Sequence, residues 1–326
     1  MAPIVPTADL LAQGLFHSLV ASLFIEALAR SWAVEHPAQK MALRLLALAY
    51  PLLVFPGLVL LFPHRGDEAF RDAALLSGRR WSDVAFLGLD LYRVFILSLA
   101  GIGLVLLAID VVALLRMLRR GRPSPAQPAP AHAAAVASAL AGLRPAGAAP
   151  QVLYLDRPLP SLFCAGVRRP ALYVTRGALD LLDAGELRAA LAHELAHLAR
   201  RDPARSWLML GLRCAMCLNP TFQVLARALA RDAERLADER GVELGADRLA
   251  LASALLKLHR ATGGLDQRRT LLFGGALDGT LRRARSHDLE RRVRALLAPA
   301  PLPLPLPWLR LGLAASSMSM LLYFVT

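Results

Sequence analysis

Lysine is nearly absent from this sequence of 326 residues, in which only Lys40 and Lys257 occur. Charged residues of all kinds reach 19%, against about 25% in ordinary globular proteins. Three cysteines are an odd number and too few for a disulfide-stapled scaffold, so we expect a reducing environment for the polar part of the chain. The first nine residues contain no lysine or arginine, which argues against a cleaved signal peptide with a basic leading end.

Apolar residues are abundant. Hydrophobic residues make up 56% of the chain, above the roughly 45–50% of globular proteins, and the mean hydropathy is +0.45. These figures exclude a disordered chain. The formal net charge is +13, and nearly all of the positive charge is arginine. Such a charge suits nucleic acid, an anionic membrane surface or the cytoplasmic flanks of membrane-spanning helices, and the apolar content favours the two membrane interpretations.

Four apolar segments have about the length that a helix needs to cross a hydrocarbon core of about 30 Å. The second contains Pro51 and Pro56, which membrane helices tolerate where neighbouring groups satisfy the freed carbonyls. The chain therefore predicts three to four transmembrane helices. The segments are residues 10–29, 41–62, 94–115 and 308–325.

Basic residues beside these segments predict their orientation, because they concentrate on the cytoplasmic side of membranes. The 30–44 connection and the arginines at 116–122 then lie inside and the N-terminus outside, whereas the arginines of the 63–83 connection disagree. We expect four parts: a three-span membrane region at 1–120, a Pro/Ala-rich linker at 121–150, a globular domain at 151–298, and a Pro-rich segment with the fourth span at 299–326.

The globular domain shows both strand and helix signals. Asp183 and Glu186 form a capping box, which predicts a helix through about residue 201. An Asp-Pro pair at 202–203 and an Asn-Pro pair at 219–220 predict two further helix starts. Strands are expected at 151–155, 161–164 and 171–175.

The most informative motif lies inside the first of these helices, in the letters HELAH. His193 and His197 are one turn apart on one helix face, so their imidazoles can bind one metal ion. Glu194 lies beside that position and can take a proton from water. Zinc is the natural occupant, because it accepts nitrogen and oxygen ligands and keeps one position open for chemistry. The alternative, two surface histidines with an exposed acid, fits poorly with a helix that is otherwise apolar.

A third protein ligand must come from elsewhere in the chain. The three-histidine pattern fails, because Arg200 occupies its glycine position and Pro203 its last histidine. Downstream, Glu234 and Asp238 are four residues apart and share a helix face. One could complete the metal site while the other contacts a metal-bound histidine. The alternative is a solvated helix with carboxylate–arginine pairs, and these residues alone leave both interpretations open.

A family resemblance bears on this choice. The string HELAHLARRD at 193–202, followed about forty residues later by an E-x-x-x-D helix, resembles the gluzincin membrane peptidases. The resemblance is to the BlaR/MecR-type antirepressor peptidases, and more distantly to the HtpX, Ste24 and Oma families. It covers roughly 150–298, and three preceding spans fit that architecture. Further similar features are Gly166, Arg169-Pro170, Leu172-Tyr173-Val174, Asn219-Pro220 and the string SHDLERRV at 286–293.

The resemblance implies roles for five residues. It implies His193, His197 and Glu234 as zinc ligands, Glu194 as the catalytic base, and Asp238 as a carboxylate that contacts a zinc-bound histidine. The implied fold is a mainly α membrane protein, with three to four transmembrane helices and an α+β zincin-like (gluzincin) metallopeptidase domain. Zn²⁺ is the expected cofactor.

The implied function is a membrane zinc endopeptidase of the bacterial inner membrane with a cytoplasmic catalytic domain. Its expected partners are the lipid bilayer and a protein substrate, either a repressor or signalling protein, with cleavage of its own chain included, or a membrane protein cut in HtpX-like quality control. A non-catalytic membrane regulator with a structural zinc site is a further alternative. We expect no direct nucleic acid binding, and no β-lactam sensor domain, because the chain ends at Thr326.

Other features of the sequence are less specific. We expect the substrate to pair with an edge strand near 171–175. Cys214 and Cys217 are expected to be packing thiols, and Glu26 and Asp110 to reach the membrane interface from helix ends. The arginine-rich segment 282–294 is expected to form a solvated helix face or a membrane-surface contact, and His259 and His287 show no spacing that indicates catalysis.

Overall fold

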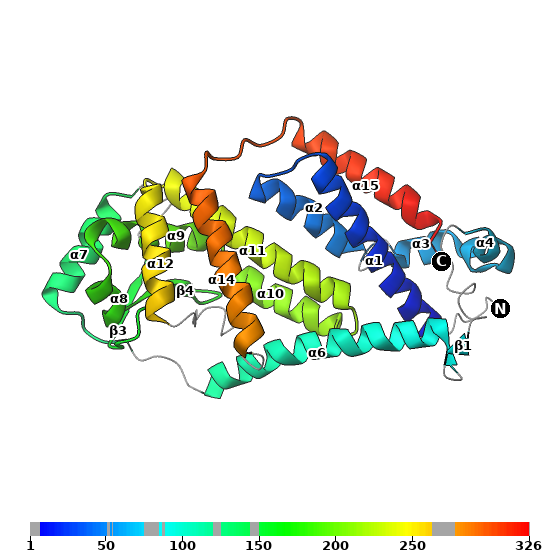
Figure 1. Cartoon of the computed structure of the whole chain (residues 1–326), viewed down its shortest axis with the longest axis horizontal. Coiled ribbons are helices and arrows are strands. Elements are labelled where there is room, and N and C mark those ends of the chain that lie inside the picture. Colours follow the sequence, from blue (N-terminus) through cyan, green and yellow to red (C-terminus); the bar gives the residue numbers. More distant parts are fainter. Residues whose placement is uncertain are drawn as a thin grey trace. The chain divides into compact units, whose positions relative to one another are not determined.

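The computed structural model (Figure 1) shows a mainly helical chain that divides into two compact units. The first comprises Met1–Leu107, Arg213–Ala233 and Pro301–Thr326, and the second Ala108–Leu212 and Glu234–Ala300. Both units therefore combine distant parts of the chain, unlike the four contiguous ranges predicted above. The described residues are 7–50, 53, 55–74, 85–86, 89–119, 125–143, 150–262 and 278–325.

The first unit is built around three packed helices. α1 (Thr7–Ser31) packs against α2 (Pro37–Ala49) and α15 (Pro307–Tyr323), and α2 also contacts α15. Serine hydroxyls inside α1 donate hydrogen bonds to carbonyls of the same helix: Ser18 donates to Gly14, and Ser22 donates to Ser18. The other elements are α3 (Phe55–Leu61), η2 (Pro63–Gly66), α4 (Glu68–Ala73), β1 (Ala85–Phe86) and β2 (Leu89–Asp90), while α6 (Leu91–Arg119) contributes residues to both units.

The predicted membrane segments coincide with helices. Segments 10–29 and 94–115 fall in α1 and α6, and 308–325 falls largely in α15. Segment 41–62 is divided between α2 and α3, and its residues 51, 52 and 54 lie outside the described part of the chain. In the part of the chain that the structure describes, no helix is both long and apolar enough to cross a membrane.

The second unit contains a three-stranded sheet, and its three strands lie where the sequence predicts strands. β3 (Val152–Leu155), β4 (Leu162–Ala165) and β5 (Ala171–Thr175) lie in the order β3-β5-β4. β5 is parallel to β3 and antiparallel to β4. The expectation of an edge strand near 171–175 is wrong, because β5 is paired on both sides. Its buried Leu172 and Val174 suit this central place, whereas strand order cannot be read from a hydrophobic run.

The helices of the second unit enclose one long buried helix. α9 (Ala184–Ala199) packs against α7 (Pro130–Ala141), α12 (Arg248–Ala261), β4 and β5. Its predicted capping box is confirmed: Asp183 accepts from the Glu186 N–H, and Glu186 accepts from that of Asp183. The other helices are α8 (Arg176–Leu181) and α14 (Asp278–Leu297), while α10 (Asp202–Ala215) and α11 (Pro220–Glu243) contribute residues to both units. Residues 121–124 and 144–149 of the predicted linker lie outside the described residues.

Candidate metal centre

The candidate centre begins with two imidazoles on the buried face of α9. His193 and His197 are 6% and 3% exposed, and their rings meet edge to face. α11 reaches this face because Gly241 has no side chain: a Cβ there would lie 3.2 Å from the backbone nitrogen of His193. Glu234 and Asp238 lie two helical turns and one helical turn before Gly241, respectively, on the same face of α11. The sequence thus brings two helices together at the motif.

Three side chains converge at one point. The Nε2 atoms of His193 and His197 are 3.1 Å apart, and carboxylate oxygens of Glu234 lie 3.6 Å and 3.7 Å from them. Zinc bonds of about 2.0–2.1 Å in a tetrahedron place ligand atoms about 3.3–3.4 Å apart. The spacing and the two-nitrogen, one-oxygen donor set of His193, His197 and Glu234 therefore fit a zinc ion.

Two carboxylates contact the far side of the imidazoles. Nδ1 of His197 lies 2.7 Å from Oδ2 of Asp202, within hydrogen-bonding distance. Nδ1 of His193 lies 3.0 Å from Oδ1 of Asp238, an ion-pair distance without the alignment of a regular hydrogen bond. A proton on Nδ1 leaves Nε2 with a lone pair for a metal. Asp238 therefore lies beside His193, and its role behind a zinc-bound histidine stays a prediction.

Sequence reasoning assigned Asp202 only to a helix start. Asp202 is indeed the first residue of α10, but the chain turns at Arg201, whose φ is +54°, and Asp202 thereby comes beside His197. Its position five residues after His197 was the available signal. That signal could not be read without knowing where α9 ends.

Arg292 is the second residue that sequence reasoning missed. Its Nε and Nη2 donate to both oxygens of Asp238 at 2.7 Å and 2.6 Å, and Nη1 lies 3.1 Å from Glu234. The expectation of a solvated helix face is wrong for this residue, which is 8% exposed. Asp288, one turn earlier on α14, is also buried, whereas His287 is exposed and lies 3.5 Å from Glu290.

The charges of the centre keep its carboxylates ionised. Burial raises the pKa of Glu234, but the nearby His197, His193 and Arg292 outweigh it and hold this pKa well below its usual value. Burial likewise raises the pKa of Asp238, and the Arg292 guanidinium outweighs it. Burial lowers the pKa of His193, but Asp238 and Glu234 raise it to about 9.

Glu194, the expected base, follows His193 on α9 and is 5% exposed. Consecutive residues of a helix point about a quarter-turn apart, so Glu194 flanks the His193–His197 face without sharing it. This position fits a group that lies beside a metal. Its role stays a prediction.

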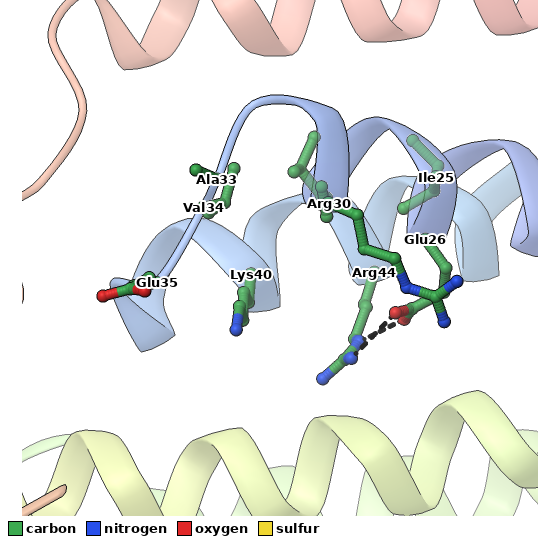
Figure 2. Close-up of a pocket in the computed structure, with 10 residues that line it drawn as sticks. Ile25, Glu26, Arg30, Ala33, Val34, Glu35, Lys40 and Arg44 are labelled. Atoms are coloured by element: carbon green, nitrogen blue, oxygen red, sulfur yellow. Dashed lines mark hydrogen bonds and ion pairs between the residues drawn. The ribbon is translucent and has the colours of Figure 1, made fainter.

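A second polar cluster lies in the first unit, beside a pocket of about 280 Å³ between α1 and α2 (Figure 2). Nε and Nη2 of Arg44 donate to Glu26 at 2.6 Å and 3.1 Å, and Nη1 donates to Asp232. Glu26, a candidate interfacial acid, is thus half-buried in an ion pair. The side chain of Asp110 lies outside the described part of the chain.

Two helices that join a His–His–Glu cluster beside a short mixed sheet define a candidate metal-dependent hydrolase centre. A family model described as BlaR1 peptidase M56 matches residues 94–295, and the chain belongs to this peptidase family. The chain is also similar to proteins named Protease HtpX homolog. The one from Salinibacter ruber is 30% identical over 140 residues, which are 34% of this chain and 50% of that protein. The one from Ralstonia nicotianae is 30% identical over 149 residues, 36% and 52% of the two chains.

The chain thus spans about half the length of these curated relatives. The resemblance to BlaR/MecR-type and HtpX-type peptidases is confirmed at the level of the family.

Proposed function

We propose that this protein is an integral membrane zinc-dependent endopeptidase whose catalytic centre is formed by His193, His197, Glu234 and Glu194. The observation that carries the proposal is the convergence of two imidazole nitrogens and one carboxylate at the spacing of zinc ligands. It lies within the segment that the peptidase family model matches. In the proposed location, the bacterial inner membrane, this centre faces the cytoplasm.

The residues around the ligands have positioning roles in this proposal. Asp202 and Asp238 hold the imidazoles with Nε2 toward the ion. Arg292 offsets the charge of Asp238 and Glu234 and keeps both from turning away. Bound zinc supplies a Lewis acid that polarises a peptide carbonyl and acidifies water.

Glu194 is the proposed general base. Its carboxylate takes one proton from the water whose oxygen attacks the carbonyl carbon of the scissile peptide. When the carbon–nitrogen bond breaks, the protonated Glu194 returns that proton to the leaving amine. Burial of Glu194 on α9, beside the histidine ligands, keeps this transfer away from bulk solvent.

We propose that the substrate pairs with β4 and not with the strand at 171–175, which the sequence had suggested. β4 is an edge strand of the described sheet and contacts α9, the helix that carries the motif. An extended peptide can add to such an edge by backbone hydrogen bonds, which gives affinity without a fixed sequence.

Replacing Glu194 tests the proposal. Purified Glu194→Gln should keep its zinc content and thermal stability but lose cleavage of an unfolded substrate such as casein. Glu243→Gln, which changes an exposed glutamate of α11, is the matched control and should cleave normally. Undiminished cleavage by Glu194→Gln would remove the proposed mechanism, and zinc without turnover in the wild type would favour the non-catalytic regulator.

Two substrate classes follow from the relatives. The BlaR1 family match favours one regulatory protein, a repressor or signalling protein, as substrate, and the HtpX homologues favour broader cleavage of membrane proteins. Comparing the proteomes of cells with wild type and Glu194→Gln discriminates them. One accumulating soluble protein supports the regulatory substrate, and many accumulating membrane proteins support the HtpX-like one.

A further inference from the structure

The exposed side of α10 carries large apolar side chains. Trp207 is 48% exposed and Leu208 65%, although the helix buries Leu210 on its other side. Gly211 and Ala215 continue the exposed side beyond Leu208. Scattered apolar residues are normal on protein surfaces. Here a tryptophan and a leucine adjoin and are followed by small residues.

Basic residues precede this apolar surface. Arg205 is exposed and lies one turn before Leu208 on the same helix face, and Arg201, also exposed, immediately precedes the helix. Asp202 is the only acid in α10; it is turned toward His197 and its side chain is 13% exposed. The exposed side of residues 201–215 therefore changes along its axis from cationic to apolar, over about 20 Å at 1.5 Å per residue.

This order of groups matches the layers of a lipid surface. Arginine side chains bind headgroup phosphates and extend their apolar stems toward the acyl chains. Tryptophan prefers the level between headgroups and acyl chains, and leucine the acyl chains. The absence of an exposed carboxylate along the described 201–215 segment makes the surface complementary to anionic lipid.

We propose that α10 (Figure 1) lies against an anionic phospholipid bilayer, with Arg201 and Arg205 at the phosphates and Trp207 and Leu208 in the upper acyl layer. The proposal rests on the membrane association in the proposed function and adds where the second unit meets the lipid. Since α10 begins at Asp202, which contacts His197, the metal centre lies within about one helical turn of the contact. The enzyme then cuts peptide bonds close to the membrane surface.

Two equally exposed leucines provide the test. Leu208 and Leu249, on α12 in the same unit, are 65% and 64% exposed. Each is changed to cysteine in the full chain carrying Cys214→Ser and Cys217→Ser, and the protein is reconstituted in phosphatidylglycerol nanodiscs. A charged, water-soluble maleimide should label Leu208→Cys about tenfold more slowly than Leu249→Cys, because a thiol in the acyl layer meets the reagent only when the helix leaves the lipid. Labelling in denaturant normalises the two rates.

A second measurement does not depend on new cysteines. Brominated phosphatidylglycerol should quench the tryptophan fluorescence of the wild type, and Trp207→Phe should lose part of that quenching. In the labelling experiment, adding Arg205→Gln to the Leu208→Cys protein should speed the labelling of this cysteine. High salt should remove the difference between the double variant and Leu208→Cys alone.

The outcomes separate this inference from the proposed function. Protein that fails to enter the nanodiscs overturns both. Protein that enters them but labels equally at the two positions overturns only the contact of α10. Protection that disappears in discs holding a single copy means that a second chain covers the surface, and it also overturns the lipid contact.

Discussion

Replacing Asp202 by asparagine isolates the carboxylate that contacts His197. Asparagine keeps the size of the side chain and its ability to begin a helix, so α10 should remain intact. The change removes the negative charge 2.7 Å from Nδ1 of His197. Asp202 also forms ion pairs with Arg200 and Arg205, at 3.6 Å and 3.7 Å. These longer contacts contribute little interaction energy by comparison.

The expected result is weaker zinc binding in a folded protein. Losing the carboxylate partner of a ligating histidine costs about 10–100-fold in metal affinity, or about 1.4–2.7 kcal/mol. Zinc affinity is measured by competition with a chromophoric chelator, and folding by circular dichroism. Asp247→Asn is the matched control, because Asp247 is the N-cap of α12 and accepts a hydrogen bond from the Ala250 N–H, outside the metal centre. If Asp202→Asn binds zinc as tightly as Asp247→Asn does, the carboxylate does not support His197.

Three further predictions concern stability. Arg292→Gln leaves two buried carboxylates without their cation and should cost about 3–5 kcal/mol in urea unfolding, while Arg291→Gln, at an exposed neighbour, should be near neutral. Because the folded-state pKa of His193 is raised from 6.5 to about 9, the metal-free protein gains stability that is fully present below pH 6.5 and lost as pH rises through 9. Melting temperatures in chelator should therefore fall across that range, and a flat profile would contradict the ion pair. Leu172→Ala, in the fully buried centre of the sheet, should cost about 2–5 kcal/mol, against a small effect of Leu159→Ala at a position 38% exposed; equal losses would mean that the sheet is not the core.

Local patterns proved readable from the sequence. The capping box at Asp183, the three strands and the one-turn spacing of His193 and His197 all depend on residues close together in the chain. Their physics is short-range: hydrogen bonds within a turn, and side-chain direction within a helix. Such features do not require knowledge of tertiary packing.

Long-range placement was not readable. Arg292 resembles any other arginine of a basic helix, since nothing nearby in the sequence shows that Asp238, 54 residues earlier, accepts hydrogen bonds from two of its three nitrogens. The central position of β5 depends likewise on pairing with strands on both sides. The family resemblance indicated Glu234, whereas the residues alone left it open between a ligand and a surface charge.

Gly241 has a consequence for the selectivity of the centre. Main chain meets main chain at this position, two turns along α11 from the carboxylate of Glu234. The distance between the histidines of α9 and Glu234 of α11 is therefore set by a backbone contact. Such a contact cannot lengthen by a change of rotamer as a side-chain contact can. A cation that needs longer bonds and more oxygens, such as calcium, would have to push two packed helices apart.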